Sequence, residues 1–185
     1  MEMFTIAKFL FAGQEIELVL PEIRHAQALY EIIVHDRVEL ARFLPWADKI
    51  NVVEDEIDFI KQMRRETAEY KKLALVVLVN GDAAGMLDLH NIKMKNQSAE
   101  IGYWLGQAYQ KKGIMTQAVK KLVEVSFNQL GLHRLSLLAD HENRASCAIA
   151  ERLNFAHIAL LPDEVKYHGE FRDMELYTLI NKNSL

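Results

Sequence analysis

Apolar and polar residues follow two periods along the chain, one typical of strands and the other of helices. The segment EIELVL (15–20) alternates in polarity, which predicts a half-buried strand. Two apolar runs flank Asn80-Gly81-Asp82, and Asn-Gly is the strongest short hairpin signal, so residues 72–92 are predicted to form a β-hairpin. Four further strands are predicted at 98–106, 133–140, 155–160 and 171–180.

Helical spacing of apolar residues appears in four other segments. Pro21 opens the first, a second helix is predicted to begin near Glu54, and its acidic first turn suits the positive end of a helix dipole. A third helix is predicted over 115–130 and is terminated by Gly131. A short fourth helix, within 143–155, begins at Asn143, a favourable N-cap residue.

The predicted order is a strand, two helices, three meandering strands, a helix, a strand, a helix and two strands. A meander followed by a strand–helix–strand crossover predicts an α/β (α+β) fold with a mixed sheet covered by helices. No linker or internal repeat divides the chain, and 185 residues suit one compact domain spanning 1–185.

Composition narrows the functional classes. The net charge of −4 argues against a general nucleic-acid binder. The apolar N-terminal run 3–13 lacks the basic start and cleavage pattern of a signal peptide, and no apolar stretch is long enough to cross a bilayer. Cys147 is the single cysteine, so no internal disulfide forms, and the histidines show no zinc-ligand spacing. We therefore expect a cytoplasmic protein without a metal and without a membrane partner.

The segment QKKGIMT (110–116) lies between a predicted strand and a predicted helix. The amides at a helix N-terminus can converge on a phosphate or pyrophosphate group, and Gly113 would let the backbone approach closely. Lys111 and Lys112 add positive charge, and the Thr116 hydroxyl is a further donor. Taken alone, the segment is better explained as a surface loop whose glycine eases a turn. It matches neither the dinucleotide-binding nor the P-loop pattern.

The neighbouring motifs resemble those of the GNAT acetyltransferase superfamily, and most closely its RimJ/RimL branch. The matching motifs are AEIGYWLG, QKKGIMTQAV, N-x-A-S-x-A-I-A-x-R-x-x-F and Y-H-G-E-F-R-D-x-x-x-Y, with a weaker match at FLPW. The resemblance implies a twisted, mixed, mostly antiparallel sheet of about seven strands flanked by helices. It also implies acetyl-CoA as co-substrate.

Site residues follow from the same resemblance. It implies that the pyrophosphate loop is Gln110-Lys111-Lys112-Gly113-Ile114-Met115, that the strand end Tyr103-Trp104-Leu105 pairs with the pantetheine arm, and that the Leu105 amide stabilises the oxyanion. Asn143 and Ser146 would lie beside the pantetheine, and Ser146 could protonate the leaving sulfur. For Asn143 and Ser146, local helix capping is the alternative interpretation.

The general base is less well defined. The glutamate expected from the RimL pattern is Val165 here, and Glu164 precedes it by one residue. A one-residue slip in a strand would turn Glu164 to the opposite face. Glu100 is a second candidate for the base, a solvated strand carboxylate being the alternative. His90 and His168 could line the acceptor pocket.

The sequence therefore predicts an N-acetyltransferase that moves an acetyl group from acetyl-CoA to a primary amine by direct transfer in a ternary complex. Cys147 is expected to be a packed thiol rather than a nucleophile. The favoured acceptor is a protein N-terminal α-amine of the ribosomal-protein type, and a homodimer is possible. The alternatives are acetylation of a small amine such as a polyamine, amino acid or aminoglycoside, or a non-catalytic acyl-CoA-binding module.

Overall fold

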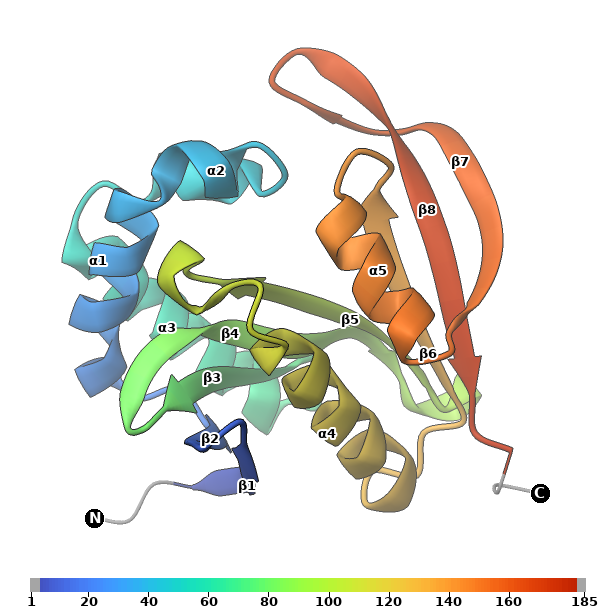
Figure 1. Cartoon of the computed structure of the whole chain (residues 1–185), viewed down its shortest axis with the longest axis horizontal. Coiled ribbons are helices and arrows are strands. Elements are labelled where there is room, and N and C mark those ends of the chain that lie inside the picture. Colours follow the sequence, from blue (N-terminus) through green and yellow to red (C-terminus); the bar gives the residue numbers. More distant parts are fainter. Residues whose placement is uncertain (1–3, 183–185) are drawn as a thin grey trace.

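The computed structural model describes residues 4–182 and contains one continuous eight-stranded sheet with the strand order β1-β2-β3-β4-β5-β6-β8-β7 (Figure 1). The strands are β1 (Thr5–Phe11), β2 (Gln14–Val19), β3 (Leu73–Val79), β4 (Asp82–Lys93), β5 (Ser98–Leu105), β6 (Arg134–Asp140), β7 (Ala156–Tyr167) and β8 (Glu170–Ile180). The α-helices are α1 (Ala26–His35), α2 (Arg37–Ala41), α3 (Val53–Ala68), α4 (Ile114–Asn128) and α5 (Arg144–Arg152). Four 3₁₀ turns complete the chain, namely η1 (Ile23–His25), η2 (Pro45–Lys49), η3 (Met94–Asn96) and η4 (Gln107–Tyr109).

The local turn and cap signals of the sequence are confirmed. Asn80 and Gly81 both have positive φ angles, of 52° and 91°, and join β3 to β4 as a two-residue hairpin. Asn143 caps α5 by accepting the Ser146 N–H, and Gly131, with φ of 65°, follows the end of α4. β5 and β6 are parallel and are joined through α4, as the strand–helix–strand pattern predicts.

The prediction of about seven strands misses β1. The sequence pattern predicts no strand in the N-terminal apolar run, whereas residues 5–11 form an edge strand antiparallel to β2. This pairing places β2 between two strands, and its residues from Ile16 to Val19 are buried rather than half-buried. Consecutive apolar residues hide the alternation of β1 in the sequence. The segments 155–160 and 171–180 also belong to longer strands, since β7 runs to Tyr167 and β8 begins at Glu170.

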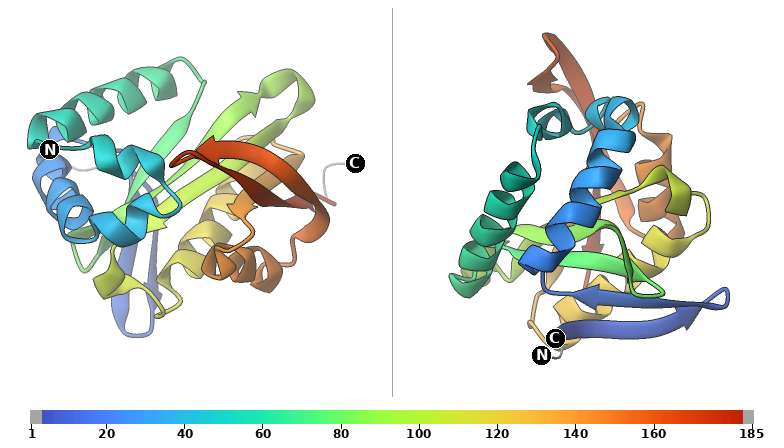
Figure 2. Two further views of the ribbon diagram at one scale, coloured as in Figure 1. Left: turned by 90° about the horizontal axis from the view of Figure 1, so that it is seen from above. Right: turned by 90° about the vertical axis from the view of Figure 1, so that its left-hand side faces the viewer.

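Two hydrophobic layers cover the two faces of the sheet. Apolar residues of α4 and α5, such as Leu122 and Ala150, pack on one face, and residues of α1 and α3, such as Leu29 and Ile60, pack on the other. Figure 2 shows α1 and α3 beside each other on their face. Because side chains alternate along a strand, Tyr103 and Leu105 belong to the first layer and Trp104 to the second.

The β7–β8 hairpin carries C-terminal residues to the far side of the sheet. At its tip, His168 Nε2 lies 2.8 Å from the carbonyl oxygen of Ala41 at the end of α2. The same imidazole approaches Asp48 of η2, with Nδ1 4.0 Å from Oδ2. Seen from above, the hairpin reaches across the molecule toward α2 and η2 (Figure 2).

Candidate active site

Strands β5 and β6 pair at one end and separate at the other. In the described chain their pairing covers Ser98–Glu100 with Arg134–Ser136. Beyond it each strand stays paired on its other edge alone, β5 with β4 and β6 with β8. The sheet is therefore open between the second halves of β5 and β6. Their carboxyl ends border this opening, and α4 and α5 begin shortly after those ends.

The last residues of β5 direct backbone groups into the opening. The Gly106 N–H donates to Ala84 O on the β4 side at 2.8 Å. Because successive N–H groups of a strand point to opposite edges, the Leu105 N–H faces β6. An amide in this place can donate to an oxyanion formed between the two strands.

The loop before α4 presents a helix N-terminus near the same opening. Gly113 is the N-cap with φ of 78°, a conformation that L-residues rarely adopt. A Cβ atom at this position would lie 3.1 Å from Cζ of Phe11 in β1, so a side chain here would be strained by the backbone and would press on the Phe11 ring. The amides of Ile114, Met115 and Thr116 form the first turn, where an anion is stabilised.

Two side chains of the loop donate hydrogen bonds to backbone carbonyl oxygens of the residues that precede it. Gln110 Nε2 donates to Leu105 O at 2.7 Å, which ties the loop to the end of β5. Lys112 Nζ donates to Ala108 O at 2.7 Å. Lys111 is exposed and has a positive φ of 59°. The loop is thus closed onto the strand end, with its two lysines at the surface.

The N-terminus of α5 lies across the opening from β5. Asn143 Oδ1 accepts the Ser146 N–H at 3.2 Å, so Asn143 is the helix cap that one interpretation of the sequence expects. The Tyr103 hydroxyl donates to the Ser146 carbonyl oxygen at 3.3 Å. Burial raises the pKa of Tyr103, so the hydroxyl stays protonated and keeps this hydrogen bond. Ser146 itself is partly exposed.

Comparison with known proteins assigns the family of this chain. The profile of the family described as "Acetyltransferase (GNAT) domain" matches residues 15–156. The chain belongs to the GNAT acetyltransferase family. The chain is 30% identical, over 92% of its length and 93% of the relative's, to YdaF of Bacillus subtilis (strain 168), whose name describes it provisionally as a ribosomal N-acetyltransferase.

Two solved structures place the fold within the same family. The microcin C7 self-immunity acetyltransferase MccE, solved with acetyl-CoA and AMP, is 28% identical, has a TM-score of 0.86, and matches over 90% of this chain and 92% of its own. RimL, a ribosomal L7/L12 α-N-protein acetyltransferase solved with coenzyme A, is 22% identical with a TM-score of 0.88, and matches over 94% of this chain and 98% of its own. The protein is an acetyl-CoA-dependent N-acetyltransferase.

In this acetyltransferase, Glu100 belongs to a charged cluster on the α1–α3 face of the sheet. His90 Nδ1 lies 2.7 Å from Asp88 Oδ1, and His90 Nε2 lies 3.1 Å from Glu100 Oε1. Burial lowers the pKa of His90, but its hydrogen bonds to the two carboxylates outweigh burial and raise the pKa to about 9. The hydrogen bond from His90 in turn lowers the pKa of Glu100. Glu100 is therefore a paired carboxylate and an intrinsically weak base.

Glu164 lies in an irregular part of the β7–β8 pairing. The register shifts between Leu161 and Val165, and Val165 then pairs with Arg172. Glu164 is exposed within this interruption, and Val165 is partly buried.

The sequence reasoning did not single out Asp140, which ends β6 beside the opening and is 4% exposed. Its carboxylate accepts from the Tyr167 hydroxyl, and Arg172 donates to it at 3.0 Å and 3.3 Å. Although burial acts in the opposite direction, these hydrogen bonds lower the pKa of Asp140. Arg172 also pairs with Glu142 at 2.6 Å, so the cluster fixes the β7–β8 hairpin to the turn before α5. The one sequence signal for Asp140 is an acidic residue at the end of an apolar strand, three residues before the N-cap Asn143.

On the α1–α3 face, η2 forms a wall beside β5 that the sequence pattern does not predict. The Trp46 ring of η2 packs on Trp104 with a centroid distance of 5.9 Å. Arg37 donates to Ala47 O at 2.6 Å and to Ile50 O at 2.5 Å, which holds η2 in place. With the His168 contact to Ala41, this wall and the hairpin tip flank the side of β5 opposite α4.

The environment of Cys147 does not favour nucleophilic catalysis by its thiol. Cys147 is 3% exposed and burial raises its pKa, which disfavours the thiolate that a nucleophile needs. Within residues 4–182, no group of three or more His, Cys, Asp or Glu side chains is arranged to hold a metal ion. No helix in that range is long and apolar enough to span a membrane.

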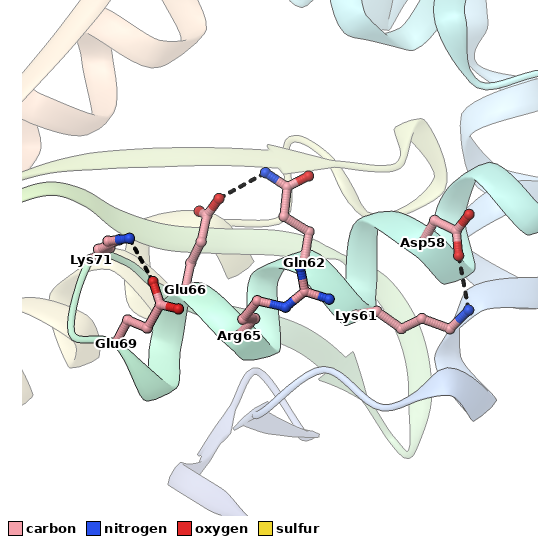
Figure 3. Close-up of a pocket in the computed structure, with 7 residues that line it drawn as sticks. All are labelled: Asp58, Lys61, Gln62, Arg65, Glu66, Glu69 and Lys71. Atoms are coloured by element: carbon pink, nitrogen blue, oxygen red, sulfur yellow. Dashed lines mark hydrogen bonds and ion pairs between the residues drawn. The ribbon is translucent and has the colours of Figure 1, made fainter.

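The groove shown in Figure 3 lies on the outer surface of α3, away from these residues. Its charged side chains pair with one another, as Lys61 does with Asp58 at 2.8 Å and Lys71 with Glu69 at 2.5 Å. It is a solvated helix face rather than a catalytic centre.

Proposed function

We propose that this N-acetyltransferase modifies protein N-terminal α-amines of the ribosomal-protein type. The support for this acceptor is the relative named as a ribosomal N-acetyltransferase, which aligns along 92% of the chain. The geometry that carries the reaction is the opening between β5 and β6, which the Leu105 N–H faces and which two helix N-termini border.

The cofactor enters from the face covered by α4 and α5. The first-turn amides of α4 bind the pyrophosphate, with Lys111 and Lys112 adding positive charge. The pantetheine arm runs along Tyr103-Trp104-Leu105 by pairing with their backbone, between that strand end and Asn143. A thioester placed in the opening then presents its carbonyl to the opposite face of the sheet. The acceptor approaches on that face, past Trp46 and His168.

The chemical step proceeds by direct attack. The neutral amine adds to the thioester carbonyl, and the oxygen of the tetrahedral intermediate takes its negative charge beside the Leu105 N–H. The intermediate collapses with cleavage of the C–S bond. The nitrogen of the intermediate loses its extra proton to water as this bond breaks. The Ser146 hydroxyl gives its own proton to the departing thiolate and takes one back from the protonated water, which leaves free coenzyme A and the amide.

The ammonium proton does not require a strong base for this acceptor. An α-amine titrates near pH 8, so a substantial neutral fraction exists at neutral pH. Glu100, held at a lowered pKa by His90, and the exposed Glu164 are the two carboxylates that could assist proton removal. In this scheme either carboxylate contributes only modestly to proton removal. The reaction therefore does not depend on a glutamate at position 165, where this chain has Val165.

The proposal is tested by a thiol-release assay with acetyl-CoA and a panel of acceptors. Peptides with ribosomal-protein N-termini are compared with the same peptides blocked by formylation, with polyamines and with aminoglycosides, and coenzyme A binding is measured by calorimetry. Turnover confined to the unblocked peptides supports the proposal. Turnover confined to polyamines or aminoglycosides would show that the acceptor is a small amine and not a protein N-terminus. Tight coenzyme A binding without any turnover would favour a non-catalytic acyl-CoA-binding module.

A ribosomal-protein acceptor would place the reaction in the cytoplasm, and a homodimer is the proposed assembly. Light scattering at micromolar concentration measures the mass directly. A mass near 21.3 kDa would correspond to a monomer and would contradict the dimer.

A further inference from the structure

The junction between α1 and α2 contacts both halves of the active site. Asp36 and Arg37 are adjacent in the chain, yet their side chains bind different segments. Asp36 is 5% exposed, and its Oδ2 accepts the Gln107 N–H at 2.7 Å. Gln107 begins η4, directly after the strand end that carries the Leu105 amide.

Further contacts hold this part of the cofactor loop on α1. A Cβ atom at Gly106 would lie 2.7 Å from Ile32 Cγ2 and 3.5 Å from Asp36 Oδ2, so the chain after β5 passes directly over the end of α1. From the other side, Gln110 bonds back to Leu105 O. The segment that leads to the pyrophosphate loop is thus held at Gln107 by a buried carboxylate and at Gln110 by its own side chain.

Arg37 acts on the acceptor side. Its guanidinium donates to Ala47 O and Ile50 O, which bracket the turn that carries Asp48 and follows Trp46. Trp46 contacts Trp104, the residue before Leu105. A shift of η2 would therefore move the wall that the acceptor passes.

We propose that Asp36 is a positioning residue for the acetyl-CoA loop and that Arg37 is a positioning residue for the acceptor wall. The junction thereby sets the spacing between the two substrates on either side of β5. The assignment of Asp36 depends only on acetyl-CoA being the co-substrate, whereas that of Arg37 rests on the proposed acceptor side.

The experiment measures coenzyme A affinity by calorimetry without any acceptor, and KM for the acceptor separately. Asp36→Ala is expected to raise the Kd of coenzyme A about tenfold, as loss of one hydrogen bond to a charged group predicts. Asp36→Asn keeps an oxygen that accepts from Gln107 and is expected to restore the Kd to within about threefold of the parent. Arg37→Ala is expected to raise the acceptor KM and leave the Kd of coenzyme A unchanged.

A second variant removes the same hydrogen bond from its donor side. Gln107 is the first residue of η4, and Gly106 before it has φ −58° and ψ 144°, a conformation compatible with a following proline. Gln107→Pro therefore removes the N–H with little backbone cost. If the hydrogen bond carries the effect, Asp36→Ala and Gln107→Pro are non-additive in the double variant. This variant keeps the question answerable if Asp36→Ala fails to fold.

Glu17→Ala is the matched control, because Glu17 is also a buried carboxylate, 8% exposed, but lies on β2 and pairs with Lys8. It is expected to change thermal stability without changing the Kd of coenzyme A. An unchanged Kd in both Asp36→Ala and Gln107→Pro would overturn the role of Asp36 whatever the acceptor is. If the Asp36 variants change the Kd of coenzyme A as expected but Arg37→Ala leaves the acceptor KM unchanged, only the role of Arg37 is overturned.

Discussion

The hydroxyl of Tyr103 donates to the carbonyl oxygen of Ser146 at 3.3 Å, across the opening where β5 and β6 have ceased to pair. This hydrogen bond joins the strand that directs the Leu105 amide to the helix that carries Ser146. The distance between the Leu105 amide and the Ser146 hydroxyl, the proposed proton donor to the leaving thiolate, therefore depends on a side chain that takes no part in the chemistry.

Removing this hydroxyl should loosen the opening while keeping the core. We expect Tyr103→Phe to lower kcat about three- to tenfold, because one hydrogen bond of about 1 kcal/mol positions the two groups. The melting temperature should fall by only a few degrees. Steady-state kinetics and a thermal melt check both values. An unchanged kcat would show that the opening keeps its width without Tyr103.

The cofactor loop should be sensitive to any side chain at Gly113. We expect Gly113→Val to raise the Kd of coenzyme A at least tenfold, because a β-branched residue opposes the positive φ and its Cβ would meet the Phe11 ring. Gly131→Val is the matched control, since Gly131 has φ of 65° near the other end of α4 and nothing within 4 Å of its Cβ position. Calorimetry compares the two variants, and circular dichroism confirms that both fold. Equal affinities would exclude the loop from the site.

Ser146 should act on the chemical step rather than on binding. We expect Ser146→Ala to lower kcat about 100-fold, the lower end of the range for general acid catalysis, with the Kd of coenzyme A changed less than about twofold. Ser126→Ala serves as the control, because Ser126 is buried in α4 and its hydroxyl donates to Leu122 O in the preceding turn of the same helix. A kcat equal to that of the parent would assign Ser146 to helix capping alone.

Glu100 can be examined through its partner His90. Glu100→Gln removes one of the two carboxylates that raise the pKa of His90 to about 9, so that pKa should fall toward 6.5. The imidazole resonances of His90, followed by NMR against pH, measure the shift. We expect kcat at pH 8 to fall less than tenfold, since a paired carboxylate of lowered pKa is a weak base. A loss of several hundredfold with a shifted acid limb of the rate profile would make Glu100 the base.

The buried Glu56 of α3 should make the protein less stable as pH rises. It is 2% exposed, its Oε1 has no hydrogen-bond partner within residues 4–182, and burial raises its pKa to about 7. Because the folded pKa lies above the ordinary value of 4.5, the unfolded chain loses this proton first as pH rises. The contribution of Glu56 to stability therefore falls between about pH 4.5 and pH 7, by on the order of 3 kcal/mol, and is level above.

Urea unfolding at pH 5 and pH 8 tests this dependence. Glu56→Gln should lose less stability than the parent between these two pH values and be more stable than the parent at pH 8. Glu54→Gln, on the exposed side of the same helix, should leave the parent's pH dependence intact. An equal loss of stability in the parent and in Glu56→Gln would contradict the assignment.

Local signals of the sequence determined those parts of the fold that depend on a few neighbouring residues. Asn80-Gly81 specifies its hairpin because both residues tolerate positive φ, and Asn143 caps α5 because its side chain reaches the amide three residues on. Gly113 identifies the loop for the same reason, since a left-handed N-cap leaves little choice of residue. The motifs around this loop predict the family, which is confirmed, and the binding of the cofactor by the loop stays a prediction.

Tertiary structure alone decided the contacts between distant segments. The pairing of β1 with β2, the separation of β5 from β6, and the Asp36 hydrogen bond to Gln107, 71 positions away, depend on register and packing that local pattern does not encode. The same holds for protonation, because the pKa values of Glu56 and His90 depend on what surrounds them after folding. The residue types at the site can be read from the sequence, whereas the fold brings particular residues face to face, because electrostatics and hydrogen bonding act through space rather than along the chain.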